Sequence, residues 1–254
     1  MIVLRSALFH ALQLCTVVPY AILCLAWAPL PRTTRYRLTV GWPRLVIRAA
    51  RSLVGIDYRV IGAERLPDEP AIVLSKHQST WETLFYPVWM QRELCYVFKR
   101  ELLWLPFFGW GIGLLDMIHI DRRQGAVASD QLLREGAIRL AQGRWIVLFP
   151  EGTRTRPGIR TRYKTGGARL AVRTGVPVIP IAVNSGEHWP RRAFVLRPGT
   201  ITVSIGEPIA SVGKTAEVLS AEVERWIESE MQRISPHLYR GPAPAPAAAP
   251  VPRQ

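Results

Sequence analysis

The chain begins with an uninterrupted apolar segment. Residues 6–31 contain no Asp, Glu, Lys or Arg, and as a helix they would reach roughly 39 Å, more than a hydrocarbon core of about 30 Å. The segment can therefore cross a bilayer, which is the interpretation we favour. Pro19 also allows a kinked helix that enters and leaves within one leaflet. A cleaved signal peptide is a third alternative, because Ala26-Trp27-Ala28 resembles a cleavage site, but the apolar run exceeds the usual length of about 7 to 15 residues.

The segment that follows is basic and amphiphilic. No acid occurs in it before Asp57, whereas only Arg5 and the amino terminus carry positive charge ahead of the apolar run. The positive-inside rule places the following domain in the cytoplasm, on the inner face of the cell inner membrane. The pattern suits an interfacial helix with snorkelling arginines, or an ordinary surface helix of the domain. The arginines are Arg32, Arg35, Arg37, Arg44, Arg48 and Arg51.

Beyond this point short β-rich runs alternate with helical stretches. Such alternation predicts a single α/β domain with a mostly buried mixed sheet flanked by helices. We therefore divide the chain into an N-terminal anchor and interfacial helix (1–55), an α/β domain (56–240) and a disordered Pro/Ala-rich tail (241–254). The predicted strands are 58–61, 71–74, 95–98, 117–120, 145–149, 178–183 and 201–205, and the predicted helices are 80–90, 125–142, 165–173 and 215–234.

Composition narrows the possible partners. The chain has 254 residues and a formal net charge of +14, which indicates an anionic partner: nucleic acid, an anionic bilayer or a phosphate-bearing substrate. No zinc-finger, RNP-type or basic-zipper pattern accompanies the charge, so we expect no nucleic acid. The three cysteines show neither CxxC pairing nor metal-ligand spacing with histidine, which argues against a disulfide framework and a zinc site.

A histidine follows the predicted strand 71–74. His77 precedes a predicted helix whose first turn contains Glu82. If His77 lies before the helix, this carboxylate can reach back, fix the imidazole tautomer and stabilise the imidazolium. The sequence Ser79-Thr80-Trp81-Glu82 also has the form of a capping box, in which Glu82 bonds the backbone N–H of Ser79. The pair is a candidate catalytic base with its orienting acid, and the alternative is helix capping.

Two further strand ends carry charge. Phe149-Pro150-Glu151-Gly152-Thr153-Arg154 follows a strand, at the edge where α/β folds bind ligands, and Arg154 offers a planar fork suited to phosphate. Ile120-Asp121-Arg122 ends another strand, and Arg122 could bind the same phosphate or form a surface pair with Asp121. The later basic residues, from Arg156 to Arg173, suit a solvated face with some membrane contact.

The last pattern is apolar. Val176-Pro177-Val178-Ile179-Pro180 contains two prolines, which fits either the lining of an acyl groove or an edge strand.

Taken in order, these four elements resemble the boxes of the glycerolipid acyltransferase family, specifically the bacterial 1-acyl-sn-glycerol-3-phosphate acyltransferases (lysophosphatidic acid acyltransferases). The family has a His-x4-Asp box, a box ending in Ile-Asp-Arg, a Phe-Pro-Glu-Gly-Thr-Arg box and a Val-Pro-Val-Ile-Pro box. The resemblance covers residues 58–209. This chain departs from the family in having Glu82 in place of aspartate and Lys76 where asparagine is common.

The resemblance implies transfer of a fatty acyl group from acyl-CoA or acyl-carrier protein to the sn-2 hydroxyl of lysophosphatidate, giving phosphatidate for phospholipid biosynthesis. It also implies no covalent acyl-enzyme, no metal and no cofactor. The implied catalytic residues are His77 and Glu82, the phosphate-binding residues Glu151, Gly152, Thr153, Arg154 and Arg122, and the acyl-groove candidates Val176, Pro177, Ile179 and Pro180.

Three alternatives stay open. The acceptor could be another lysolipid, such as a lyso-ornithine lipid or lysophosphatidylethanolamine. A hydrolase could use the same base, but the chain has no GxSxG elbow, and Ser79 is adjacent to His77 only in sequence. A non-catalytic basic membrane-surface protein would explain the charge and the apolar segment, but not the ordered boxes.

Overall fold

A computed structural model describes residues 1–104 and 108–239, apart from the side chains of Phe108, Trp110 and Arg122. The helices are α1 (Ile2–Ala26), α2 (Arg32–Thr39), α3 (Gly41–Ala49), α4 (Trp81–Trp89), α5 (Phe108–Gly113), α6 (Ala126–Ala141), α7 (Gly166–Thr174) and α8 (Ala216–Ile234). The strands are β1 (Ile56–Ile61), β2 (Ile72–Ser75), β3 (Leu94–Lys99), β4 (Ile118–Ile120), β5 (Trp145–Leu148), β6 (Val178–Val183) and β7 (Gly199–Ile205). A π-helical segment (Ala50–Val54) extends α3, and short 3₁₀ turns occupy Ala63–Arg65, Arg100–Trp104, Arg122–Gln124 and Ser185–Glu187.

The strands form one seven-stranded mixed sheet in the order β1-β7-β6-β2-β5-β3-β4. Pairing is parallel except between β6 and β7. The carboxyl ends of β6, β2, β5, β3 and β4 therefore meet at one edge, where the loops after them can combine into a site. The predicted α/β fold is confirmed, including the mixed sheet.

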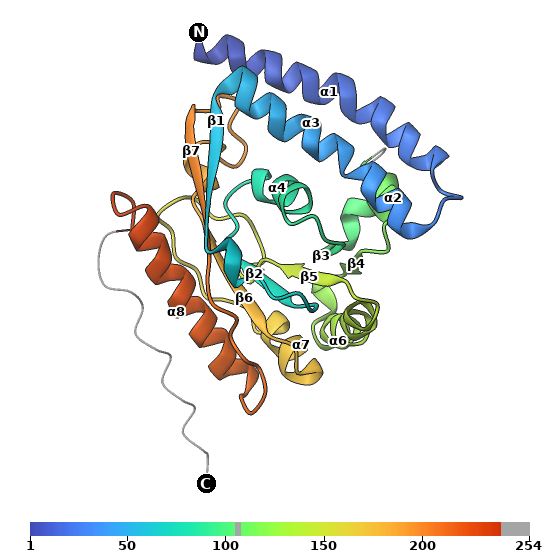
Figure 1. The fold of residues 1–254 in the computed structure, drawn as a ribbon, viewed down its shortest axis with the longest axis vertical. Helices are drawn as coiled ribbons and strands as arrows, with labels where there is room; N and C mark the ends of the chain where they lie inside the picture. Colours follow the sequence, from blue (N-terminus) through green and yellow to red (C-terminus); the bar gives the residue numbers. More distant parts are fainter. Residues whose placement is uncertain (105–107, 240–254) are drawn as a thin grey trace.

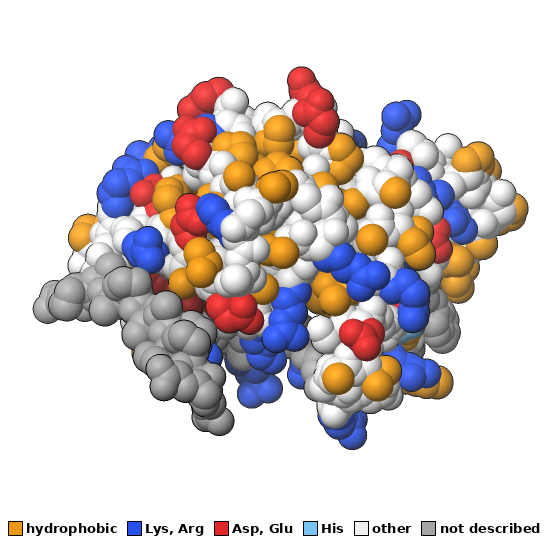
Figure 2. All heavy atoms as spheres, turned by 90° about the horizontal axis from the view of Figure 1, so that it is seen from below, with side chains coloured by type: hydrophobic (Ala, Val, Ile, Leu, Met, Phe, Trp, Pro, Cys, Tyr) orange, Lys and Arg blue, Asp and Glu red, His pale blue; other side chains and the backbone are white. Residues whose placement is uncertain are grey.

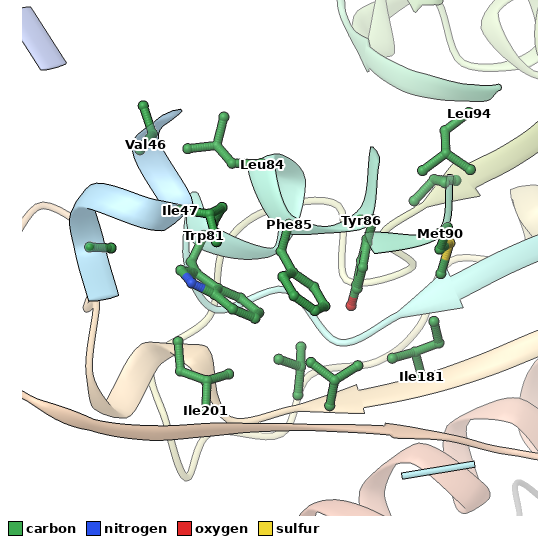
Figure 3. Packing of buried hydrophobic residues seen from close by; sticks show 14 of the residues in the cluster. Val46, Ile47, Trp81, Leu84, Phe85, Tyr86, Met90, Leu94, Ile181 and Ile201 are labelled. Carbon is green, nitrogen blue, oxygen red and sulfur yellow. The ribbon is translucent and has the colours of Figure 1, made fainter. Parts of the chain in front are cut away.

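The sheet separates two hydrophobic cores. One core lies under α3 and α4, and the other lies under α6, α7 and α8 (Figure 1). In the first core Trp81 and Phe85 of α4 stack with ring centroids 4.3 Å apart, between Ile47 of α3 and Ile201 of β7 (Figure 3). α4 follows β2 directly, so this packing holds the start of α4 close to the carboxyl end of β2.

All seven predicted strands and all four predicted helices of the α/β domain are present, with ends shifted by at most two residues. These predictions were based on the alternation of short apolar runs with helical stretches along the sequence. The helix α5 was not predicted, because it contains three glycines in six residues, and the single helix expected over the basic segment is divided into α2 and α3.

The apolar run at 176–180 is not an edge strand. β6 pairs with β2 on one side and with β7 on the other, and Ile179 and Pro180 are buried inside the sheet. Pro180 is tolerated there because the regular β6–β7 pairing stops at Ile181 and Ile205, and beyond it Pro180 takes part through its carbonyl, which accepts the N–H of Gly206. The edge-strand alternative is therefore wrong. The assignment of Ile179 and Pro180 to an acyl groove stays a prediction, and the structure places both residues in the buried centre of the sheet. Val176 and Pro177 are half-buried in the turn that enters it.

The N-terminal segment packs on the domain. α1 is long and apolar enough to cross a membrane by its length and composition, yet it contacts α3, α5 and the π-helical turn. Phe9 is fully buried against Trp189, and Ser6 accepts the backbone N–H of Leu196 through its hydroxyl. Farther along α1, Tyr20 donates its hydroxyl to the carbonyl of Leu38. Residues 1–55 thus share the first core with the α/β domain, whereas the predicted tail at 241–254 lies outside the described residues.

Candidate functional site

His77 lies in the loop between β2 and α4, at the edge where the strand ends meet. Its ring stacks on Phe149, which follows β5, with centroids 3.8 Å apart. The backbone on both sides of the ring is fixed by the β5 loop: the N–H of His77 donates to Glu151 Oε2 at 2.6 Å, and its carbonyl accepts the N–H of Thr155 at 2.8 Å. The side chain keeps 15% exposure, so the imidazole is rigidly held but accessible.

Glu82 is the acid that orients the imidazole. Its fully buried carboxylate lies in the first turn of α4, with Oε1 2.9 Å from His77 Nδ1. The same oxygen accepts the backbone N–H groups of Gln78 and Ser79, and Oε2 accepts the Ser185 hydroxyl at 2.7 Å. Because an ionised carboxylate can only accept, Nδ1 carries the hydrogen and Nε2 presents its lone pair to the site. The Glu82 side chain therefore both caps the start of α4 and orients the imidazole.

Lys76 sits immediately before the histidine in a buried ion triad. Lys76 Nζ lies 2.8 Å from Glu151 Oε1 and 2.7 Å from Glu228 Oε1, and all three side chains are at most 1% exposed. Tyr163 donates its hydroxyl to Glu228. Burial disfavours the ammonium, but the attraction of the two carboxylates outweighs it and the pKa of Lys76 is raised. Burial also raises the pKa of Glu151, and the charge of Lys76 offsets part of that rise. The triad ties α8 and the β5 loop to the histidine.

The loop after β5 supplies the candidate phosphate ligands. Gly152 adopts φ +74°, a left-handed conformation that favours glycine over residues with a Cβ. Arg154 is half-buried and donates to the Thr80 hydroxyl at 2.6 Å. Burial and the neighbouring guanidinium of Arg191 lower the pKa of Arg154. Thr153 is exposed beside it.

Glu151 and Arg122 were also predicted to bind phosphate. Glu151 points away from solvent toward Lys76 and the His77 backbone, so its carboxylate is placed to hold the loop that carries Arg154. Its assignment to phosphate binding stays a prediction. The side chain of Arg122 lies outside the described residues, so its role stays a prediction.

A pocket of about 270 Å³ opens beside His77 on the side of α6 and α7. Its buried wall is apolar, with Val97, Leu132 and Leu148, and its exposed members include Lys164 and Arg169. Sequence reasoning did not separate Lys164 and Arg169 from the solvated basic run in which they occur. The arrangement can accept an apolar chain with a polar or anionic continuation next to the imidazole.

The hydroxyl of Ser79 is not placed as a nucleophile. The side chain is fully buried, and its oxygen accepts the backbone N–H of Trp81 at 3.0 Å. Among the described residues no group of three or more His, Cys, Asp or Glu could hold a metal ion. The expectation that the reaction uses no metal or cofactor stays a prediction.

Comparisons with known proteins agree on one family. A family model described as Acyltransferase matches residues 57–184. A 1-acyl-sn-glycerol-3-phosphate acyltransferase from Pseudomonas aeruginosa is 41% identical over 249 residues, which cover 96% of each chain. The alpha 1-acyl-sn-glycerol-3-phosphate acyltransferase of Mus musculus is 32% identical over 70% of this chain and 64% of its own. A crystal structure of the 1-acyl-sn-glycerophosphate acyltransferase from Thermotoga maritima superimposes with a TM-score of 0.75 and 25% identity, covering 91% of this chain and 95% of that one.

Proposed function

This chain belongs to the acyltransferase family, and from that membership we propose that it transfers a fatty acyl group from acyl-CoA or acyl-carrier protein to the sn-2 hydroxyl of lysophosphatidate. The product is phosphatidate, and the enzyme is an O-acyltransferase of phospholipid biosynthesis. The observation that carries the proposal is the 41% identity over 96% of both chains to a 1-acyl-sn-glycerol-3-phosphate acyltransferase. The oriented His77–Glu82 pair provides the base that this reaction needs.

The geometry supports a direct transfer. His77 Nε2 takes the proton of the acceptor hydroxyl as its oxygen attacks the thioester carbonyl. The new C–O bond forms, the C–S bond breaks, and the imidazolium returns its proton to the departing thiolate. Glu82 stabilises the imidazolium in between. The N–H groups of Gln78 and Ser79 are occupied by Glu82, so the donors that stabilise the oxyanion come from elsewhere in the site.

Both substrates have candidate positions. The pocket beside His77 suits the acyl donor, because its apolar wall can take the chain next to the thioester while Lys164 and Arg169 face an anionic donor. Arg154 suits the acceptor phosphate, since its guanidinium lies beside Thr80, at the end of the loop (76–80) that carries His77 and leads into α4.

Arg154 and the acceptor can be tested in one assay. Membranes containing the protein are incubated with radiolabelled oleoyl-CoA or oleoyl-acyl-carrier protein and either lysophosphatidate or lysophosphatidylethanolamine. Labelled phosphatidate is the expected main product. Arg154→Ala should raise KM for lysophosphatidate roughly 10- to 100-fold, the value of a lost charged hydrogen bond, and Arg154→Lys should raise it less. Preference for an acceptor without a phosphomonoester, with equal KM for the variants, would exclude both the proposed acceptor and the role of Arg154.

For the membrane, we propose that α1 lies in the plane of one leaflet. Its inward face contacts the α/β domain toward both ends: Phe9 packs on Trp189 in the loop after β6, and farther along the helix Cys24 lies next to Gly111 of α5. A helix that crosses a bilayer could not keep both contacts with a domain in water. Its outward face exposes large apolar side chains, among them Leu4, Leu8 and Leu14. By contrast, the face of the molecule opposite α1 mixes apolar, basic and acidic side chains (Figure 2). These contacts favour the one-leaflet alternative over the membrane span.

The two topologies differ in the side of the membrane on which the amino-terminal end of α1 lies. Single cysteines are placed by Ile2→Cys or Pro31→Cys in a background without Cys15, Cys24 and Cys95, and an impermeant maleimide is added to intact spheroplasts or to inverted membrane vesicles. We expect both positions to react only in inverted vesicles. Reaction at position 2 only in spheroplasts, with position 31 as the internal reference, would establish a membrane span.

A further inference from the structure

A second concave region lies away from the pocket beside His77. The loop at 188–198 between β6 and β7 forms one wall of a cavity of about 740 Å³. Its basic lining residues come from three separate places in the sequence: Arg156, His188, Arg191, Arg192, Arg197 and His237. The family boxes contain none of them, and the mechanism above does not use them.

The charge in this cavity is one-sided. Glu187 is the only acid in its lining, and its carboxylate already accepts the Ser235 hydroxyl and contacts His237 Nε2 at 2.9 Å. Within the part of the chain that the structure describes, none of the four arginines is paired with a carboxylate. Crowded guanidinium groups repel one another, so the arrangement is stabilised when an anion enters.

The loop at 188–198, called the arginine loop from here on, is held in one conformation. Arg192 adopts φ +60°, a left-handed conformation that a non-glycine residue adopts only where its surroundings enforce it. Arg197 donates its N–H to the His188 carbonyl at 2.8 Å, and Arg191 donates from Nη1 to the Arg154 carbonyl at 3.0 Å. The guanidinium groups are thus presented by a fixed loop. Arginine forks in a fixed arrangement favour phosphate oxygens.

The same loop contacts α1. Phe194 is 55% exposed, and its carbonyl lies 2.9 Å from His10 Nε2 on α1. Leu4 and Leu8, which are 64% and 53% exposed, lie on the opposite, outward face of this helix. The cavity is therefore lined by a loop that borders the helix we assign to the membrane, where the abundant phosphate groups belong to lipid headgroups.

We propose that this cavity binds the phosphate of an anionic glycerophospholipid in the leaflet that holds α1, at a site that adjoins Arg154 but uses the arginines of the 188–198 loop in place of the proposed acceptor ligands. The bound lipid would neutralise the arginine loop while Phe194 inserts beside it. The inference rests on the in-plane position of α1 from the proposed function and is independent of acyl transfer.

Vesicle binding without substrates tests the site. Purified protein is mixed with phosphatidylcholine vesicles, with or without 30% phosphatidate (an amount chosen as roughly typical of an anionic surface), and partition is measured by sedimentation. The test variant is Arg192→Asn with Arg197→Ala, because asparagine tolerates a left-handed backbone. The matched control is Arg173→Ala with Arg225→Ala, which removes the same charge from exposed positions on α7 and α8.

The test variant should bind phosphatidate vesicles about 30-fold more weakly than wild type, the effect of two arginines at an anionic surface, while the control binds like wild type. Both should bind pure phosphatidylcholine vesicles like wild type, which reports insertion of α1. Equal losses of binding to phosphatidate vesicles in the test and control variants would show that only the total charge matters, which would overturn the proposal. A raised KM for oleoyl-CoA with unchanged vesicle binding would overturn it too, by assigning the cavity to the nucleotide phosphates of the donor. Failure to bind any vesicle by the wild type would contradict the placement of α1 instead.

Discussion

His77→Ala is expected to lower kcat for phosphatidate formation by about 10³-fold, within the usual contribution of a positioned general base. The acceptor hydroxyl then has no group to take its proton as the thioester is attacked. KM for lysophosphatidate should change little, since Arg154 and its loop are held by other contacts. Initial rates with radiolabelled oleoyl-CoA measure both constants. Activity within tenfold of wild type would remove His77 from the chemical step.

Two neighbouring variants separate this explanation from others. Glu82→Gln keeps an oxygen for the N–H groups of Gln78 and Ser79 but removes the charge that stabilises the imidazolium, so kcat should fall to a value between those of wild type and His77→Ala. Ser79→Ala should keep kcat within about threefold, because its buried hydroxyl only accepts the N–H of Trp81. Loss of all activity in Ser79→Ala would revive a covalent serine mechanism.

Lys76→Met is expected to destabilise the protein by about 3 to 5 kcal/mol, because it leaves the carboxylates of Glu151 and Glu228 buried without their partner. For a chain of this size the loss corresponds to a fall in Tm of roughly 10 °C. The folded-state pKa of Lys76 is raised, so its contribution is complete below its unfolded pKa of about 10.4 and is lost only as the pH rises through the folded value. Thermal unfolding at neutral pH therefore reports the full effect.

Glu228→Gln provides the comparison, since it keeps the Lys76–Glu151 pair and should cost less. Both variants should also reduce kcat, because Glu151 holds the backbone of His77. A Lys76→Met protein as stable as wild type would mean that the two acids are not charged in the folded state.

The sequence predicted the fold and the centre of the site well because both depend on local patterns. Buried apolar runs located the strands, and the spacing of His77 and Glu82 across a helix start allowed the contact that the structure contains. Their catalytic roles, like those of Thr153 and Arg154 in phosphate binding, stay predictions.

What could not be predicted depends on long-range packing. Glu228 reaches Lys76 across 152 positions of sequence, and Ser185 reaches Glu82 across 103. Only the placement of α8 and of the β6 end creates these contacts. A weak signal existed for Glu228, an acid next to the apolar face formed by Val223, Ile227 and Met231. Apolar composition alone also could not distinguish the central strand β6 from a groove lining, because both require the same side chains.

The triad also determines when the active site can assemble during synthesis of the chain. α1 is synthesised before the α/β domain and exposes apolar side chains on its outward face, so under the proposed placement of α1 a nascent chain can reach the membrane early. Lys76 and Glu151 are synthesised next, whereas the second carboxylate of the triad, Glu228, comes much later, and Tyr239, which accepts the side-chain amide of Gln78, comes later still. Under the same proposal the chain attaches to the membrane before the loop that carries His77 is complete, and so before it can acylate a substrate.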